Sequence, residues 1–181
     1  MSDREELKKL IDQLAIQRGE FTLASGAKAN YYIDCRKVTL DSRGAGLIGK
    51  LLYERLDETG FPDAVGGMAI GADPITGSVV CYSGLQGREV SGFIVRKEEK
   101  QHGTGRMVEG PIHSGQSAVI LEDVVTTGGS SLKAIKLAKE AGLDVKSVVC
   151  LVDRLAGGRE KFESEGLAFD SLFTIEDFGL V

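Results

Sequence analysis

The chain has 181 residues, of which 42% are apolar and 27% charged, so one globular domain is expected and a disordered, collagen-like or coiled-coil chain is excluded. Its 22 Lys and Arg residues against 27 Asp and Glu residues give a net charge of −5, which argues against nucleic acid and anionic membranes as partners. The 24 glycines indicate many tight loops.

The first residues, MSDREELKKL, lack the apolar segment of a secretion signal, and no apolar run in the chain approaches the roughly 20 residues that a membrane-spanning helix needs. The cysteines, Cys35, Cys81 and Cys150, are odd in number, widely spaced and without a Cys-x-x-Cys motif. Reduced core thiols are therefore expected rather than disulfides or a zinc site, and the expected compartment is the cytoplasm.

An amphipathic helix is predicted over residues 3–17. Ser2 and Glu5 have the spacing of a capping box at its start. The apolar residues that follow at helical spacing are Leu7, Leu10, Ile11 and Leu14. Short strands are expected next, at 21–23 and 31–35.

A second helix is predicted from Asp41 or Ser42 to Gly60. Residues 44–50, GAGLIGK, match the G-x-G-x-x-G pattern and nearly match a phosphate-binding P-loop. The P-loop interpretation fails because Leu51 stands where a Ser or Thr must bind magnesium, and no strongly apolar strand precedes the motif. Close packing of this helix against a neighbour explains the glycines better.

From residue 63 onward, short apolar runs alternate with predicted helices at 74–85 and 130–141. The runs are Ala64–Ile70, Ser91–Val95, Ser117–Leu121 and Ser147–Val152. Uniformly apolar runs favour strands buried on both faces, and the alternation predicts an α/β fold with an open, mainly parallel sheet flanked by helices. We expect one domain over residues 1–181, with residues 1–40 forming a small hood over the sheet edge.

The unusual polar residues follow these runs. They are Gly71-Ala72-Asp73-Pro74, the loop 96–106, Glu122-Asp123 with the turn after it, and Asp153-Arg154. Because ligands bind at the carboxyl ends of the strands in open α/β sheets, this distribution predicts one site at that edge.

Residues 119–130, VILEDVVTTGGS, combine an acidic pair with a turn of hydroxyls and glycines that opens a helix. Backbone N–H groups, hydroxyls and a helix N-terminus suit a phosphate. The carboxylates of Glu122 and Asp123 repel a phosphate and suit sugar hydroxyls or a metal ion instead. The motif thus favours a ligand with a phosphate and a polyol; the alternative is an ordinary junction capped by Ser130.

The loop 96–106 has four Lys or Arg residues against two Glu residues, in a chain that is acidic as a whole. Such a loop can fold over an anion, and its position after a buried strand favours this function. The alternative is a solvated charged loop.

Residues 119–130 resemble the phosphoribosyl-diphosphate (PRPP) signature of type I phosphoribosyltransferases. Residues 21–26, Tyr31-Tyr32, the loop 96–103 and Asp153-Arg154 narrow this resemblance to the orotate phosphoribosyltransferase family. It implies transfer of phosphoribose from PRPP to orotate, giving orotidine 5′-monophosphate and pyrophosphate in pyrimidine (UMP) biosynthesis. It also implies Mg²⁺, held mainly through PRPP and not directly by side chains, and a homodimer in which the 96–106 loop reaches the neighbour's active site.

The resemblance assigns roles residue by residue. PRPP-binding positions are Arg96, Lys97, Lys100, His102, Glu122, Asp123, Val124, Val125, Thr126, Thr127, Gly128, Gly129 and Ser130. Within this set, the acidic pair matches ribose ligands, residues 126–130 match the 5′-phosphate loop, and the loop cations match pyrophosphate ligands. Orotate-binding positions are Thr126, Arg154, Lys28 and Tyr32, and catalytic positions are Lys100, Asp123, Arg96 and His102.

The chain departs from the family pattern at two places. Ala24 stands where many members have Lys, so Lys28 is a candidate substitute, and residues 71–74 lack a lysine that some members carry. Three rival functions remain: a purine or uracil phosphoribosyltransferase, a non-catalytic PRPP sensor, and a phospho-acceptor domain built on Asp123.

Overall fold

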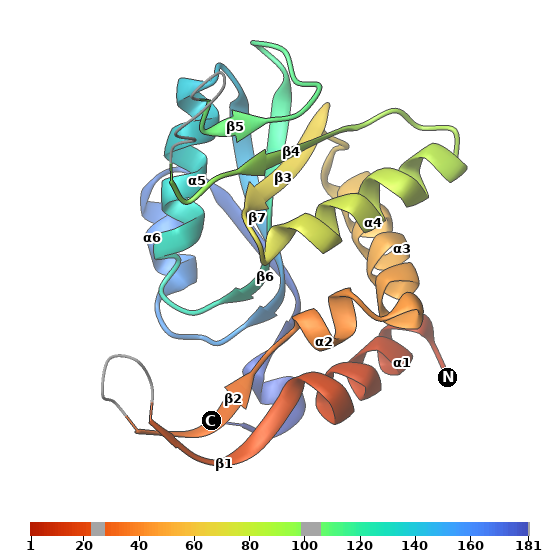
Figure 1. The fold of residues 1–181 in the computed structure, drawn as a ribbon, viewed down its shortest axis with the longest axis vertical. Coiled ribbons are helices and arrows are strands. Elements are labelled where there is room, and N and C mark those ends of the chain that lie inside the picture. Colours follow the sequence, from red (N-terminus) through yellow and green to blue (C-terminus); the bar gives the residue numbers. More distant parts are fainter. Residues whose placement is uncertain (23–27, 99–105, 181) are drawn as a thin grey trace.

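The computed structural model describes residues 1–22, 28–98 and 106–180 (Figure 1). Its main sheet has six strands in the order β5-β4-β3-β6-β7-β8, all parallel except β5, which confirms the predicted α/β fold. The strands are β3 (Ala64–Met68), β4 (Ser91–Val95), β5 (Val108–Glu109), β6 (Ser117–Val125), β7 (Asp144–Asp153) and β8 (Ala168–Thr174).

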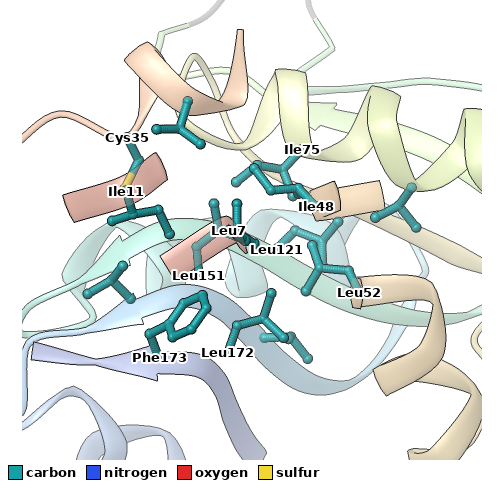
Figure 2. Packing of buried hydrophobic residues seen from close by; sticks show 14 of the residues in the cluster. Leu7, Ile11, Cys35, Ile48, Leu52, Ile75, Leu121, Leu151, Leu172 and Phe173 are labelled. Atoms are coloured by element: carbon teal, nitrogen blue, oxygen red, sulfur yellow. The ribbon is translucent and has the colours of Figure 1, made fainter. Parts of the chain in front are cut away.

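Helices cover both faces of this sheet (Figure 1). The helices α3 (Ser42–Thr59) and α4 (Ala72–Leu85) lie on one face, and α5 (Gly129–Glu140) and α6 (Gly158–Ser164) lie on the other. Successive residues of β6 pack on opposite faces of the sheet. Leu121 packs with Ile48 of α3 and Ile75 of α4 (Figure 2), whereas Ile120 belongs to the core that α5 and α6 cover. A strand buried on both faces explains the uniformly apolar run in the sequence.

The N-terminal segment comprises α1 (Asp3–Leu10), a π-helical turn (Ile11–Ala15), a hairpin and α2 (Arg36–Thr39). The capping box of α1 is confirmed, because Ser2 and Glu5 exchange both of its hydrogen bonds. The predicted end of this helix at residue 17 is wrong, because β1 (Ile16–Thr22) already pairs with β2 (Lys28–Ile33). Leu7 and Ile11 are fully buried in the core shared with α3, while the hairpin extends from the body of the protein (Figures 1 and 2).

The glycines of α3 allow close helix packing, as the sequence suggested. A β-carbon added at Gly49 would lie 2.6 Å from the backbone oxygen of Ser78 in α4, and one at Gly44 would meet the backbone oxygen of Val38. Gly46 has open space around it and carries no such constraint. The start of α3 is capped by Asp41, whose side chain accepts hydrogen bonds from two backbone N–H groups.

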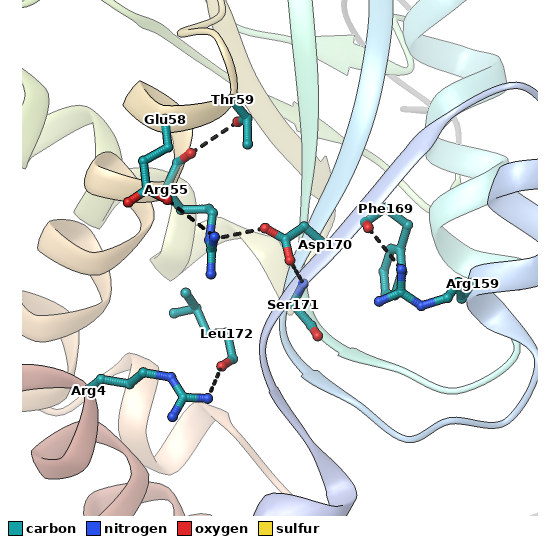
Figure 3. Close-up of polar contacts among 9 residues, drawn as sticks. All are labelled: Arg4, Arg55, Glu58, Thr59, Arg159, Phe169, Asp170, Ser171 and Leu172. Atoms are coloured by element: carbon teal, nitrogen blue, oxygen red, sulfur yellow. Dashed lines mark hydrogen bonds and ion pairs between the residues drawn. The ribbon is translucent and has the colours of Figure 1, made fainter.

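The C-terminal part was not predicted from the sequence. It adds α6, the edge strand β8 and a 3₁₀ turn at Ile175–Phe178. Figure 3 shows how β8 is joined to the helices: Arg55 of α3 lies 3.1 Å from the carboxylate of Asp170, and Arg4 of α1 donates to the backbone oxygen of Leu172 at 2.9 Å. In the described residues, no helix is both long and apolar enough to cross a membrane.

Candidate functional site

A cleft of about 380 Å³ lies at the carboxyl ends of β3, β6 and β7. Its walls come from the end of β2 and the turn after it, the turn between β3 and α4, Lys97, residues 122–124, Thr126, Ser130 and Arg154. The segments that follow four parallel strands of the main sheet, β3, β4, β6 and β7, therefore meet in one place, as the parallel topology requires. Larger hollows occur elsewhere on the protein, but they do not gather these polar residues.

The acidic pair lies within β6 rather than after it. The strand was predicted to end at Leu121, but it continues to Val125 because Val124 and Val125 pair with β7. Glu122 is 5% exposed and contacts α5, whereas Asp123 is half-buried, on the side of the β3–α4 turn. Both residues line the cleft and the charge of Asp123 acts on Glu122, but Glu122 is in addition hydrogen-bonded to the start of α5.

Glu122 is held by two serines at the start of α5. Its Oε2 atom accepts hydrogen bonds from the hydroxyl of Ser130, at 3.1 Å, and from that of Ser131, at 2.9 Å. Burial, and next the negative charge of Asp123, raise the pKa of Glu122 from 4.5 to about 7, although the two hydroxyls act in the opposite direction.

Asp123 faces the cleft beside the β3–α4 turn. Its Oδ1 atom accepts a hydrogen bond from the backbone N–H of Val124 at 2.8 Å. A β-carbon added at Gly71 would lie 2.9 Å from the same oxygen, so glycine is what allows the turn to approach the carboxylate this closely.

The turn after β6 is built for an anion. Gly128 has φ +73° and precedes the first residue of α5, so the chain reverses sharply and directs the N-terminus of a 12-residue helix to the cleft edge. Thr126 and Ser130 line the cleft, whereas Thr127, Gly128 and Gly129 do not. The side chain of Val125 lies in the core below it.

Arg154 lies in the cleft wall, and Tyr31 holds it from behind the cleft lining. Arg154 follows β7, and its backbone N–H donates to the backbone oxygen of Val125 at 2.9 Å. Its guanidinium carbon lies 4.8 Å from the centre of the Tyr31 ring, and its Nε atom donates to the Tyr31 hydroxyl at 3.3 Å. Tyr32 also lines the cleft and is 42% exposed, while Lys28 does not reach it.

An ion pair of the cleft wall was missed by the sequence analysis. Arg36 donates to both carboxylate oxygens of Asp34, at 2.7 and 3.1 Å. The Arg36 guanidinium holds the pKa of the Asp34 carboxyl below its usual range. Only the short i, i+2 spacing of the two charges signalled this pair in the sequence.

The charged loop is described only at its ends. Lys97 lines the cleft, and its backbone oxygen accepts a hydrogen bond from Lys133 of α5 at 2.9 Å. Arg96 does not line the cleft; it pairs with Glu109 of β5 at 3.3 Å. Lys100 and His102, like Ala24, lie outside the described residues.

The donor set suits a metal ion that arrives with a phosphorylated ligand. No group of three or more His, Cys, Asp or Glu side chains that would hold a metal occurs in the described ranges. Asp123 nevertheless presents a half-buried carboxylate to the cleft. One carboxylate plus phosphate oxygens is a common arrangement for Mg²⁺.

Comparisons with known proteins agree with this geometry. Residues 41–171 match the family model described as Phosphoribosyl transferase domain, so the fold and the turn after β6 define a phosphoribosyltransferase. The orotate phosphoribosyltransferase of Rhodopirellula baltica is 54% identical and covers 98% of this chain and 95% of that protein. That of Aquifex aeolicus is 43% identical and covers 98% of both.

A solved structure agrees as well. Mycobacterium tuberculosis H37Rv orotate phosphoribosyltransferase in complex with PRPP matches with a TM-score of 0.84 and 36% identity, over 99% of this chain and 100% of that one. The chain belongs to the orotate phosphoribosyltransferase family.

Proposed function

We propose that this chain transfers the 5-phosphoribosyl group of PRPP to orotate, giving orotidine 5′-monophosphate and pyrophosphate on the route to UMP. The observation that carries the proposal is the meeting, in one cleft, of Asp123, the turn with Thr126 and Ser130, and Arg154. These groups match the three parts of the reaction: a ribose, its phosphate and an anionic base.

The Thr126–Ser130 turn binds the 5′-phosphate in this proposal. The N-terminus of α5 supplies backbone N–H groups and a favourable dipole, and the Thr126 and Ser130 hydroxyls add donors at the cleft surface. Asp123 accepts hydrogen bonds from the ribose hydroxyls, because its carboxylate faces the cleft and lies in β6, three residues before the turn that begins at Thr126.

Cations balance the charge that develops when the bond from ribose C1 to pyrophosphate breaks. Lys97 faces the cleft, and we assign Lys100, His102 and Arg96 to the leaving pyrophosphate together with it. Asp123 would be available to hold Mg²⁺ that binds with PRPP, and the ion would supply neutralisation of phosphate charge there. The ring nitrogen of orotate is already a nucleophile, so the protein needs to orient it rather than activate it.

Arg154 orients orotate through a carboxylate or carbonyl oxygen of the base. Its guanidinium lies in the cleft wall with one face against Tyr31, which fixes its plane and leaves its other N–H groups for the base. Tyr32 and Thr126 also line the cleft. Lys28 lies outside it, so this lysine can bind orotate only if the hairpin moves toward the cleft.

A homodimer would complete the site. Arg96 pairs with Glu109 instead of lining its own cleft, which suits a contribution to the cleft of a second copy. Leu85 at the end of α4 is 78% exposed and is available for such a contact. Three free cysteines, two of them buried, fit the reducing cytoplasm as the place of the reaction.

The test is the loss of orotate absorbance on mixing protein, PRPP, orotate and Mg²⁺. We expect turnover only with all four present, and loss of turnover when any one is left out. A parallel screen with uracil, adenine and hypoxanthine decides between this function and transfer to another base. Clear PRPP binding with no turnover of any base would instead identify a PRPP sensor and overturn the proposal.

A further inference from the structure

Two serine hydroxyls share a single acceptor beneath the phosphate-binding turn. Ser130 and Ser131 both donate to the Oε2 atom of Glu122, at 3.1 and 2.9 Å. The two serines differ in where they lie. Ser130 is exposed and lines the cleft, whereas Ser131 is 1% exposed and packed against the strand.

A serine hydroxyl carries one hydrogen and therefore donates one hydrogen bond at a time. Ser130 cannot donate to Glu122 and to a phosphoryl oxygen together. If Ser130 binds the 5′-phosphate, its hydroxyl must turn away from Glu122 when the ligand arrives. The Oε2 atom of Glu122 then keeps only the hydrogen bond from Ser131.

Glu122 is too deeply buried to replace a lost donor with bulk water, since only 5% of it is exposed. A buried oxygen left without a donor destabilises the state in which this happens. Ser131 prevents that outcome in the ligand-bound state, because its hydroxyl is directed at Glu122 and lies out of reach of the cleft surface.

We propose that Ser131 is a positioning residue for PRPP binding: it keeps Glu122 hydrogen-bonded and so frees the hydroxyl of Ser130 for the 5′-phosphate. The inference rests on the proposed phosphate site at Thr126–Ser130. It assigns a role to a residue that contacts no ligand and acts only through Glu122 and Ser130.

A double-mutant cycle tests this role. PRPP binding is measured by calorimetry with Mg²⁺ and no orotate, at about pH 8, where Glu122 is ionised. The four proteins are the wild type, Ser130→Ala, Ser131→Ala and the double variant. We expect Ser131→Ala to weaken binding about tenfold when Ser130 is present, because either Glu122 or the phosphate then lacks a donor.

In the Ser130→Ala background, the same change leaves Glu122 without a donor in the free and bound states alike. Because this penalty is the same in the free and bound states, it does not change the affinity. We therefore expect Ser131→Ala to change the dissociation constant less than about twofold in this background. An equal loss in both backgrounds would mean that Ser131 only supports the fold, and would overturn the inference. No loss with Ser130→Ala alone would instead contradict the phosphate site itself.

Two further variants keep the test decisive. Ser131→Cys has nearly the same shape with a much weaker donor, and it replaces Ser131→Ala in the cycle if the alanine variant does not fold. Ser83→Ala is the matched control, because Ser83 is a buried serine whose hydroxyl has no partner among the described residues of α4 and its surroundings. The affinity of the Ser83→Ala protein for PRPP should equal that of the wild type.

Discussion

The guanidinium of Arg154 lies against the ring of Tyr31, 4.8 Å from its centre, and donates to the hydroxyl of the same residue at 3.3 Å. The contact joins the end of β7 to the hairpin and fixes the plane of the guanidinium at the cleft wall. A planar, oriented guanidinium is suited to recognising a planar anion such as orotate.

Replacing Arg154 with alanine should raise the KM for orotate about ten- to a hundredfold, because a charge-assisted hydrogen bond to the substrate is lost. Tyr31→Phe keeps the ring beneath the guanidinium but removes the hydroxyl, and should raise the same KM only about fivefold. Steady-state kinetics with each substrate varied separately provides the measurement. An unchanged KM for orotate in Arg154→Ala, with the KM for PRPP raised instead, would move Arg154 to the other substrate.

Asp123→Asn tests the contact with ribose. Asparagine keeps an oxygen for the backbone N–H of Val124, so the local fold should survive, but it loses the negative charge that strengthens hydrogen bonds from sugar hydroxyls. We expect PRPP binding, measured by calorimetry, to weaken about tenfold or more. Equal affinity in the two proteins would contradict the assignment of Asp123 to ribose.

Local patterns in the sequence predicted the elements but not the contacts between them. The uniformly apolar runs placed β3, β4, β6 and β7. Of these, β3, β6 and β7 are buried on both faces, whereas Ile94 of β4 is 38% exposed. The end of β6 was missed because Glu122 and Asp123 interrupt its apolar pattern, while pairing with β7 holds the strand to Val125. Pairing with a neighbouring strand, and not the local apolar pattern, therefore determines where β6 ends.

The site could be predicted in part, because its residues follow strands that the apolar pattern identifies. Topology alone requires that the segments after β3, β6 and β7 meet, so Asp123, Thr126, Ser130 and Arg154 were found. The partner of Arg154 is 123 positions away in the sequence, in a hairpin outside the main sheet, and no pattern connects the two. The hydrogen bonds of Glu122 to the start of α5 also required the tertiary structure.

Gly128→Ala should destabilise the protein and weaken PRPP binding. Gly128 has φ +73°, and a β-carbon there would lie 2.8 Å from the ring of Phe162, which is fully buried. We expect a loss of about 1–3 kcal/mol in the free energy of unfolding, measured in urea. Gly129→Ala is the control for stability, since a β-carbon at that position has open space and Gly129 has no positive φ. Equal stability of the two variants would show that the turn tolerates a side chain at both positions.

Lys100→Ala tests the role of the charged loop. If Lys100 stabilises the leaving pyrophosphate, the change should lower kcat about 10²- to 10³-fold while the thermal unfolding midpoint stays unchanged. Unchanged turnover would remove Lys100 from the mechanism.

The same variant shows whether the loop acts across a dimer. Lys100→Ala and Arg154→Ala subunits, each strongly impaired alone when orotate is kept below the KM of the wild type, are unfolded together and refolded as a mixture. A heterodimer then has one site with both residues intact, so about a quarter of wild-type activity should return after random pairing. Verified heterodimers without activity would mean that each site is built within one chain.

Stability should depend on pH through Glu122. Its pKa is raised from 4.5 to about 7 in the folded protein, chiefly by burial, so the folded state binds more protons than the unfolded state between these values. The stabilising contribution of the protonated carboxyl is complete below about pH 4.5 and is lost as the pH rises through about 7.

Glu122→Gln cannot titrate, so the wild type should lose about 1–3 kcal/mol relative to this variant between pH 5 and 8, measured by urea unfolding. Other groups, such as Asp34 with its lowered pKa, affect both proteins equally and cancel in the difference. Parallel stability curves for the two proteins would mean that burial does not raise the pKa of Glu122 in the folded protein.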